Sequence, residues 1–167
     1  MPVDRGVRLG FLLAGLVLAG DVLTKAAIVA WVDYGSRLEW SPILNIVHLL
    51  NRGAAFSFLH DAAGWQRFFF IAIALVASAY LVHMIRRPGT SSTERMGFGL
   101  ILGGALANML DRLWRGAVVD WIDLHWGEHH WPAFNIADIG ITAGAVLIVA
   151  HELFARKQVR EASGRAG

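Results

Sequence analysis

The sequence predicts an all-α membrane protein, with four transmembrane helices in a single domain that covers residues 1–167. Hydrophobic residues make up 56% of the chain and charged residues only 17%, a balance that is too apolar for a soluble domain. Four apolar runs approach the length of about 20 residues that a helix needs to cross a hydrocarbon core about 30 Å thick. The charges and tryptophans are also distributed unequally between the two ends of these runs.

The apolar runs define the helices in order. Each must be a helix, because a lone strand in lipid leaves its backbone hydrogen-bonding groups unpaired. Arg5 and Arg8 precede the first run, as in a cleavable signal peptide, but the run continues as far as Trp31, and this length favours a membrane span. The four predicted spans cover residues 9–31, 68–85, 96–113 and 134–154.

The basic residues predict the orientation of the chain. Arginines and lysines gather before the first run, between the second and third, and after the fourth, so the positive-inside rule places both termini in the cytoplasm. The outer loops are then residues 32–67 and 114–133, and all seven tryptophans lie in or beside them, as expected of an interfacial aromatic belt. The tail 156–167 is polar and lacks periodicity, and we expect it to be disordered near anionic headgroups.

Local signals indicate how the loops and helices pack. In the first outer loop, LEWSPILNIVHLL combines β-branched and aromatic residues around Pro42, which is typical of extended structure, and NRGAAF supplies a glycine turn. Gly99 and Gly103 form one GxxxG pair and Gly140 and Gly144 another, which predicts close approach of these helices. The chain has no cysteine, so disulfides and thiol chemistry are excluded and stability must come from packing.

Polar side chains interrupt the first and third runs at the same depth. Asp21 and Lys25 lie about 18 and 24 Å from the cytoplasmic end of the first helix, and Asn108, Asp111 and Arg112 lie equally far along the third. Each charge costs roughly 2.5 to 3.5 kcal/mol at the bilayer centre, so we expect these groups to pair around a hydrated cleft in the outer half of the membrane.

Carboxylates near the outer surface could complete a reactive site. Asn135 and Asp138 lie within roughly 6 Å of the outer end of the fourth helix. Asp138 could simply cap this helix, whose dipole favours a negative charge at its N-terminus. Alternatively, Asp120 or Asp123 in VVDWIDLHW could reach it, and two carboxyls in one site can act together as general base and general acid. That is the arrangement of an aspartic protease, and the residues alone leave open which of the two is the partner.

Other functions fit the same residues less well. Intramembrane charges also mark ion pathways, so a small transporter or ion pathway is the main alternative, but the charges cluster in the outer halves of the runs and do not form a path across the membrane. A scaffold without chemistry would explain the glycines but not the polar cluster. His125, His129 and His130 suggest a metal site, but no metal-binding spacing such as HExxH appears, and we expect neither a metal nor another cofactor.

Five segments in order, which together span nearly the whole chain, resemble the motifs of lipoprotein signal peptidase, the type II signal peptidase of bacteria. They are DVLTK, NRGAAFSF, GGALANMLDR, VVDW and FNIAD. The resemblance implies an aspartic endopeptidase of the cytoplasmic (inner) membrane that cleaves prolipoproteins N-terminal to a diacylglyceryl-modified cysteine. Trp121 departs from the family, which usually has phenylalanine after the first catalytic aspartate.

The resemblance also implies roles for individual residues. The catalytic pair is Asp120 and Asp138, with Asp123 left without a catalytic role, and Asp21, Lys25 and Asp111 are structural polar pairing. The residues that bind substrate or support the pair are Asn51, Gly53, Asn108, Arg112 and Asn135.

The family fold adds a small extracytoplasmic β-sheet and a short surface helix near residues 61–66 that can act as a lid. The implied partners are lipidated prolipoproteins and membrane lipids, not nucleic acid, and we expect a monomer. The position of Asp138 at a helix N-terminus suggests that it is the more readily ionised carboxyl, and that Asp120, on its loop, is the more mobile one.

Overall fold

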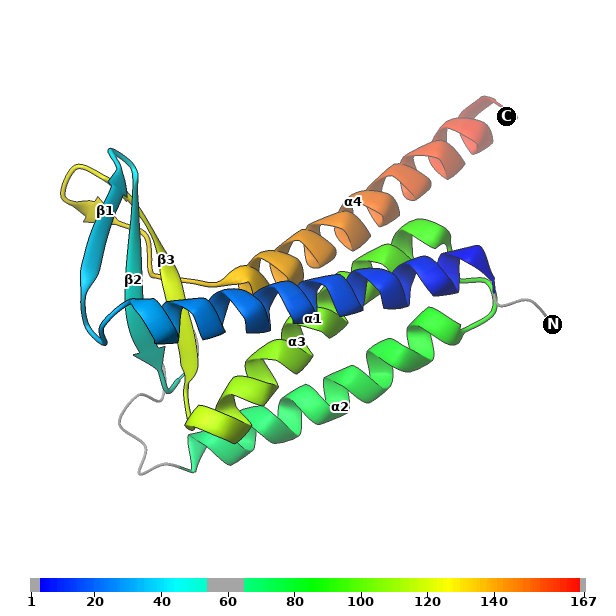
Figure 1. The fold of residues 1–167 in the computed structure, drawn as a ribbon. Helices are drawn as coiled ribbons and strands as arrows, with labels where there is room; N and C mark the ends of the chain where they lie inside the picture. Colours follow the sequence, from blue (N-terminus) through cyan, green and yellow to red (C-terminus); the bar gives the residue numbers. More distant parts are fainter. Residues whose placement is uncertain (1–3, 54–64, 166–167) are drawn as a thin grey trace.

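The chain folds into four long helices with a small sheet at one end, as the computed structural model shows for residues 4–53 and 65–165, with side chains as far as 154 (Figure 1). All four predicted apolar runs are helical. The elements are α1 (Arg5–Trp31), β1 (Arg37–Ser41), β2 (Leu44–Asn51), α2 (Gln66–Arg86), α3 (Ser92–Arg115), β3 (Val118–Trp126), β4 (His129–His130) and α4 (Ile136–Arg165).

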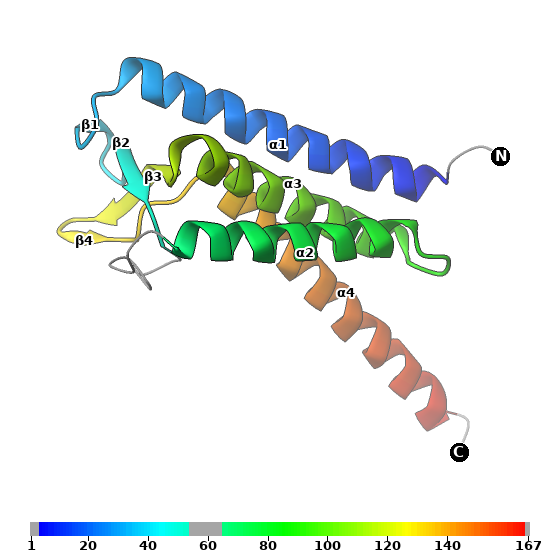
Figure 2. The ribbon, with the colours of Figure 1, turned by 90° about the horizontal axis from the view of Figure 1, so that it is seen from below.

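Helix α3 is the central helix of the bundle, since it packs against α1, α2 and α4, whereas those three make few contacts with one another (Figure 2). Within the described residues, three helices are long and apolar enough to cross a membrane: α1, α2 and the Ile136–Phe154 part of α4. Three of the four predicted spans are therefore candidate membrane helices by their length and composition. Helix α3 is less apolar because much of its surface faces protein. Its buried residues include four glycines and one alanine, as well as Arg95 and Asp111.

The glycine pairs lie where α3 meets its neighbours. A Cβ atom on Gly99 would overlap the carbonyl oxygen of Gly10 in α1, and one on Gly103 would overlap that of Ala14. On the other side of α3, a Cβ atom on Gly144 of α4 would come within 2.5 Å of the carbonyl oxygen of Gly97. The predicted close approach is confirmed, and it brings the backbones of α1 and α4 onto α3.

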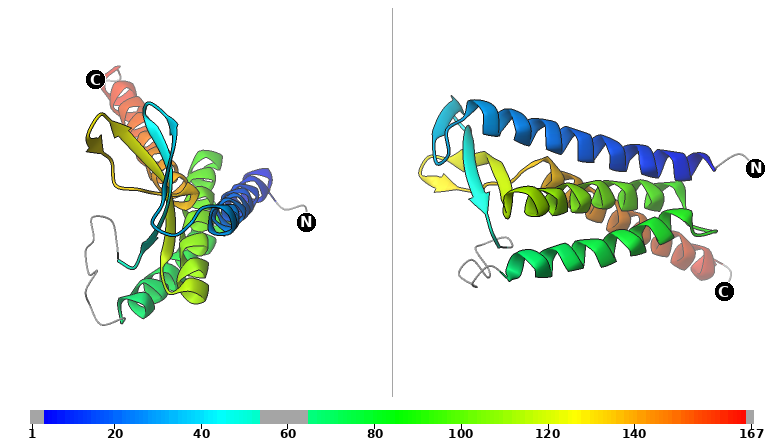
Figure 3. Two further views of the ribbon diagram at one scale, coloured as in Figure 1. Left: turned by 60° about the vertical axis from the view of Figure 1, so that its left-hand side comes forward. Right: turned by 60° about the horizontal axis from the view of Figure 1, so that its bottom comes forward.

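The sheet is antiparallel with the order β1-β2-β3-β4, and it lies at the end of the bundle where α1 ends and α2 and α4 begin (Figure 3). Ile46 pairs with Ile122 and Leu49 with Asp120, so β2 has one residue more than β3 between these pairs, a β-bulge. The extended structure predicted for the first outer loop is confirmed. The second outer loop was predicted without a strand, but its VVDWIDLHW forms β3 because β-branched and aromatic residues pair well across a sheet.

Exposed tryptophans gather at the sheet end of the bundle, on the ends of the helices and on the strands and loops between them. Each is at least half exposed, while Trp121 on β3 is partly buried. They are Trp31, Trp40, Trp65, Trp114, Trp126 and Trp131.

The C-terminal tail and the predicted surface helix lie at the edges of the described structure. The tail predicted to be disordered from residue 156 is helical as far as Arg165, so this prediction is wrong there, because alanine, arginine, lysine, glutamine and glutamate are good helix formers and extend α4. Residues 61–64 of the predicted surface helix near 61–66 lie outside the described residues, and α2 begins at Gln66.

Candidate active site

The candidate site lies where the C-terminal part of α3, the first turn of α4 and strands β2 and β3 meet. Gly104 permits this meeting on the helix side, because a Cβ atom there would overlap the carbonyl oxygen of Ala137 at the start of α4. Asp120 projects from β3 and is only 4% exposed, and Asp138 stands in the first turn of α4 and is partly exposed. The structure thus brings together carboxyls that lie on different elements.

Asp120 is held by two neutral amides. Asn135 donates from Nδ2 to one carboxyl oxygen at 2.7 Å, and Asn51 donates from Nδ2 to the other at 3.0 Å. Burial, and next the nearby charge of Asp138, raise the pKa of Asp120 to about 6, and the two amide hydrogen bonds only partly oppose this shift. Asp120 therefore keeps its proton at a pH where an exposed aspartate has lost it. Asp120 lies on a paired strand, so the expectation that it lies on a loop is wrong.

Asp138 is part of the N-terminal cap of α4. Its backbone N–H donates to Oδ1 of Asn135 at 3.0 Å, and its own carboxylate accepts from the backbone N–H of Asn135 at 3.3 Å, the reciprocal pattern of a capping box. The capping interpretation is therefore correct for the structure. The other carboxylate oxygen accepts from Nδ2 of Asn108 at 3.0 Å, so a second donor is directed at the group.

Asn135 connects the two carboxyls. It is fully buried, its side-chain amide donates to Asp120, and its backbone N–H donates to Asp138. A single residue therefore fixes both acids, which differ in their burial and in their other hydrogen-bond partners.

Arg112 and Gly53 orient the remaining donors. Arg112 donates to the carbonyl oxygen of Asn108 at 3.1 Å and to that of Gly53 at 3.0 Å, and its guanidinium lies 4.9 Å from the ring centre of Phe70. The backbone N–H of Gly53 donates to Oδ1 of Asn51 at 3.0 Å, which turns the amide nitrogen of Asn51 toward Asp120. Phe70 was not predicted from the sequence, because nothing distinguishes it from its phenylalanine neighbours at the start of α2.

The predicted polar pairing of Asp21, Lys25 and Asp111 is present beside this site. The Lys25 ammonium lies 2.7 Å from the Asp21 carboxylate and 2.9 Å from that of Asp111, and all three side chains are buried. Asp111 also pairs with Arg115 at the end of α3. These contacts compensate the charges that the sequence places within helices α1 and α3.

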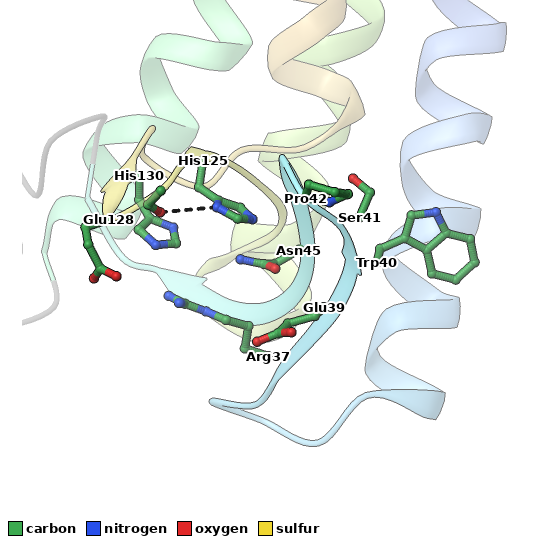
Figure 4. Close-up of a pocket in the computed structure, with 10 residues that line it drawn as sticks. Arg37, Glu39, Trp40, Ser41, Pro42, Asn45, His125, Glu128 and His130 are labelled. Carbon is green, nitrogen blue, oxygen red and sulfur yellow. Dashed lines mark hydrogen bonds between the residues drawn. The ribbon is translucent and has the colours of Figure 1, made fainter.

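Asp123 is separated from the other two carboxyls. It accepts hydrogen bonds from Asn45 at 2.9 Å and from His130 at 2.8 Å, and it lies 3.7 Å from Arg37. Asn45, Arg37 and His130 line a hollow of about 530 Å³ on the sheet, which neither Asp120 nor Asp138 lines (Figure 4). Among the described residues, no group of three histidine, aspartate or glutamate side chains is arranged to hold a metal ion.

Comparison with known proteins places this chain in a family. Residues 13–154 match the family model described as Signal peptidase (SPase) II. The lipoprotein signal peptidase of Serratia marcescens is 45% identical over 148 residues, which cover 87% of this chain and 85% of that protein. The lipoprotein signal peptidase of Francisella tularensis subsp. mediasiatica is 41% identical over 150 residues, covering 89% and 93%.

The fold agrees with the sequence match. A bacterial membrane enzyme solved by the in meso method at 2.3 Å resolution superposes with a TM-score of 0.80 at 32% identity, covering 89% of this chain and 90% of that one. The family model covers most of the chain, including every residue of the candidate site. The chain therefore belongs to the signal peptidase II family.

Proposed function

We propose that this protein is a membrane aspartic endopeptidase that removes the signal peptide from diacylglyceryl-modified prolipoproteins, with Asp120 and Asp138 as its catalytic dyad. The observation that carries the proposal is the pair of carboxyls joined through Asn135, one of them with a raised pKa. The relatives named lipoprotein signal peptidase supply the substrate class. All groups of the proposed site come from one chain, so the proposed active unit is a monomer surrounded by membrane lipid.

The two acids divide the proton transfers between them. Asp138 acts as general base, because a helix N-terminus and the Asn108 amide favour its negative charge. It takes a proton from water, whose oxygen attacks the peptide carbonyl carbon. Asp120 gives its proton to the carbonyl oxygen, which forms a tetrahedral diol.

Collapse of the diol reverses the roles of the acids. The C–N bond breaks, Asp138 returns its proton to the amine of the lipidated cysteine, and Asp120 regains a proton from a diol hydroxyl. The products are the signal peptide with a free carboxylate and the lipoprotein with a free N-terminal amine. The pair titrates as a unit through this cycle.

Asparagine substitutions test the dyad. Purified wild type, Asp120→Asn and Asp138→Asn are each incubated in detergent with a diacylglyceryl-modified prolipoprotein, and the released signal peptide is measured. Each variant should lose on the order of 10³-fold or more in kcat, because each removes a group that transfers protons in both steps. Near-normal cleavage by either variant, or none by wild type, contradicts the proposed dyad.

The proposed topology has four membrane-spanning helices, both termini in the cytoplasm, and the sheet and dyad at the extracytoplasmic face. Helix α3 has 24 residues and so is about 36 Å long, enough to span, and its neighbours cover its less apolar surface. The arginines beyond the opposite end of the bundle support this orientation.

Single cysteines test the topology cleanly, because the chain contains none of its own. Pro88→Cys, between α2 and α3, should react with a membrane-impermeant maleimide only from the cytoplasmic side. Glu128→Cys, between β3 and β4, should react only from the outside. Both residues are exposed, so access depends on the side of the membrane. Reaction of both positions from one side excludes this topology.

A further inference from the structure

Lys25 is the centre of a buried network that lies beside the dyad. Its side chain is 1% exposed, its ammonium donates to Oδ1 of Asn108 at 3.0 Å, and it forms ion pairs with the carboxylates of Asp21 and Asp111 at 2.7 and 2.9 Å. An ammonium has three protons to donate and no acceptor. The Lys25 ammonium therefore contacts three different side chains, all of them through oxygen atoms.

Both carboxylates of the network continue to the backbone just before a dyad residue. Asp111 accepts the backbone N–H of Val119 at 3.1 Å, and Val119 immediately precedes Asp120. Asp21 accepts the backbone N–H of Ala137 at 2.8 Å, and Ala137 immediately precedes Asp138. These two backbone donors are buried, so no solvent competes for them. Strand β3 and helix α4 are thus tied to the same ammonium by equivalent paths.

The third branch reaches the dyad through a side chain. The amide of Asn108 accepts from Lys25 at its oxygen and donates from its nitrogen to Asp138 at 3.0 Å. Because Lys25 can only donate, it permits only one orientation of this amide. Without the ammonium, the amide could rotate and direct its oxygen at the Asp138 carboxylate.

We infer that Lys25 is a positioning residue of the dyad, whose ammonium fixes β3 at Val119, α4 at Ala137 and the Asn108 amide in one arrangement. This inference rests on the proposed function. Neutralising the two carboxylates would not by itself require three contacts from Lys25. Asp111 already has Arg115 as a partner, and Asp21 needs only one contact. The spacing of the two reacting carboxyls therefore depends on a residue that contacts neither of them.

The main test removes Lys25 without leaving an unpaired buried charge. In the double variant Lys25→Met with Asp21→Asn, one positive and one negative charge are lost together, the new amide oxygen can still accept from Ala137, and Asp111 keeps Arg115. We expect kcat to fall on the order of 10²-fold, the loss that a displacement of about 1 Å can cause, while KM stays within about threefold. The pH profile of kcat should shift as well, because the environment of Asp138 changes.

A matched control lies at the other end of the same two helices. Arg95 of α3 and Asp4 also form an ion pair, at 2.5 Å, that joins α3 to the start of α1, and Arg95 is buried. The double variant Asp4→Asn with Arg95→Met removes this pair. Its kcat and pH profile should match those of wild type, whatever it does to the melting temperature. Equal losses of kcat in both double variants would attribute the effect to general loosening of the bundle and overturn the inference.

Lys25→Arg separates charge from geometry and keeps the test decisive if the double variant fails to fold. Arginine retains the positive charge for both carboxylates, but its planar fork cannot reproduce three donors around one nitrogen. A folded Lys25→Arg protein should lose about tenfold or more in kcat by misplacement of the dyad. Wild-type kcat in this variant would mean that charge alone suffices, and the positioning role would be excluded.

A double-mutant cycle with Asn108→Ala tests the third branch. If Lys25 acts partly through Asn108, the loss of kcat in the combined variant will be smaller than the product of the separate losses. Independent losses exclude that branch. Asp120→Asn and Asp138→Asn belong in the same series: if they are active, the proposed function fails, and if they are inactive while the Lys25 variants turn over normally, only the positioning inference fails.

Discussion

Asp120 and Asp123 lie three residues apart on the same strand, and each is 4% exposed, yet their surroundings differ in kind. Residues three apart on a strand face opposite sides of the sheet. Asp120 receives hydrogen bonds from two neutral amides, whereas Asp123 receives them from Asn45 and His130 and also lies near Arg37. The strand therefore carries two buried carboxyls in two electrostatic environments.

The pKa values of the two carboxyls shift in opposite directions, because burial prevails at Asp120 and the partners prevail at Asp123. Burial raises the pKa of both carboxyls. For Asp120 it prevails, with the charge of Asp138 adding to it, and the pKa reaches about 6. For Asp123 the hydrogen bonds from Asn45 and His130, with the charges of His130 and Arg37, outweigh it and hold the pKa below its usual value. Neutral donors can thus fix a carboxyl in place and leave it able to carry a proton, whereas cationic partners that contact it favour its ionised form.

The largest expected difference between Asp120 and Asp123 is in the effect of their substitution on kcat. Asp120→Asn should lower kcat on the order of 10³-fold or more, because it removes a proton donor, while Asp123→Asn should stay within about threefold of wild type. Loss of the Asp123 hydrogen bonds should appear instead as a lower melting temperature, at a cost of about 1 to 3 kcal/mol in the free energy of unfolding. Signal-peptide release and thermal melts of both variants make this measurement, and a large loss of kcat in Asp123→Asn would remove the distinction.

The pH dependence of stability should have opposite signs for the two residues. Because the folded state holds the Asp120 proton more tightly than the unfolded state, its contribution is fully present below about pH 4 and is lost as the pH rises toward 6, by about 3 kcal/mol at most. The contribution of Asp123 is present above its usual pKa of 3.8 and is lost as the pH falls through the lower folded value.

Thermal melts of wild type, Asp120→Asn and Asp123→Asn between pH 3 and pH 7 can detect this contrast. Asp120→Asn should gain stability relative to wild type as the pH rises from about 4 to 6, and Asp123→Asn should approach wild type as the pH falls below about 4. Parallel curves for all three proteins are incompatible with the two assigned environments.

The amide partners should show the same contrast at a smaller scale. Asn51→Ala removes a donor to Asp120 and should lower kcat about 10- to 100-fold, since a hydrogen bond to a charged or reacting group is worth about 1.5 to 3 kcal/mol. Asn45→Ala removes the equivalent donor to Asp123 and should affect the melting temperature but leave kcat nearly unchanged. Similar kcat values for the two alanine variants would mean that the two amides do not differ in function.

The smallest effect is expected at Arg37. Its pair with Asp123 is 3.7 Å long and its side chain is 54% exposed, so Arg37→Gln should change the free energy of unfolding by no more than about 0.5 kcal/mol. The change should shrink further when the melts are repeated at about 1 M salt, where exposed charges are screened. A change of several kcal/mol would show that Arg37 contributes more to the environment of Asp123 than this geometry predicts.

The helices and the polar faces that they share could be predicted from the sequence, because both depend on spacing along one chain. Apolar length predicts the helices, and i to i+4 spacing places Asp21 with Lys25 on one face. Helix α3 was harder, because a helix that packs against three others needs less apolar surface than its neighbours. The polar composition after residue 156 predicts disorder, but the residues there are good helix formers, and α4 extends through them.

The choice between Asp120 and Asp123 could not be made from local signals. Both are aspartates on the same short segment, and which face of the sheet each occupies depends on the pairing of β3 with β2, a segment about seventy residues earlier. The resemblance to a known family assigned Asp120. The connections from Lys25 to the backbone of Val119 and Ala137 left no sequence pattern either, because backbone donors look alike in every sequence.

The bulge in β2 also predicts which changes this protein can accept during evolution or engineering. Between the Ile46 and Leu49 pairs, β2 contains one residue more than β3. This extra residue determines which face of the sheet the following residues of β2, including Asn51, occupy. Deleting one residue there would turn the side chains on one side of the deletion to the opposite face of the sheet. This strand should therefore tolerate many substitutions but no change in length, so libraries built on this fold should vary its residues and leave their number fixed.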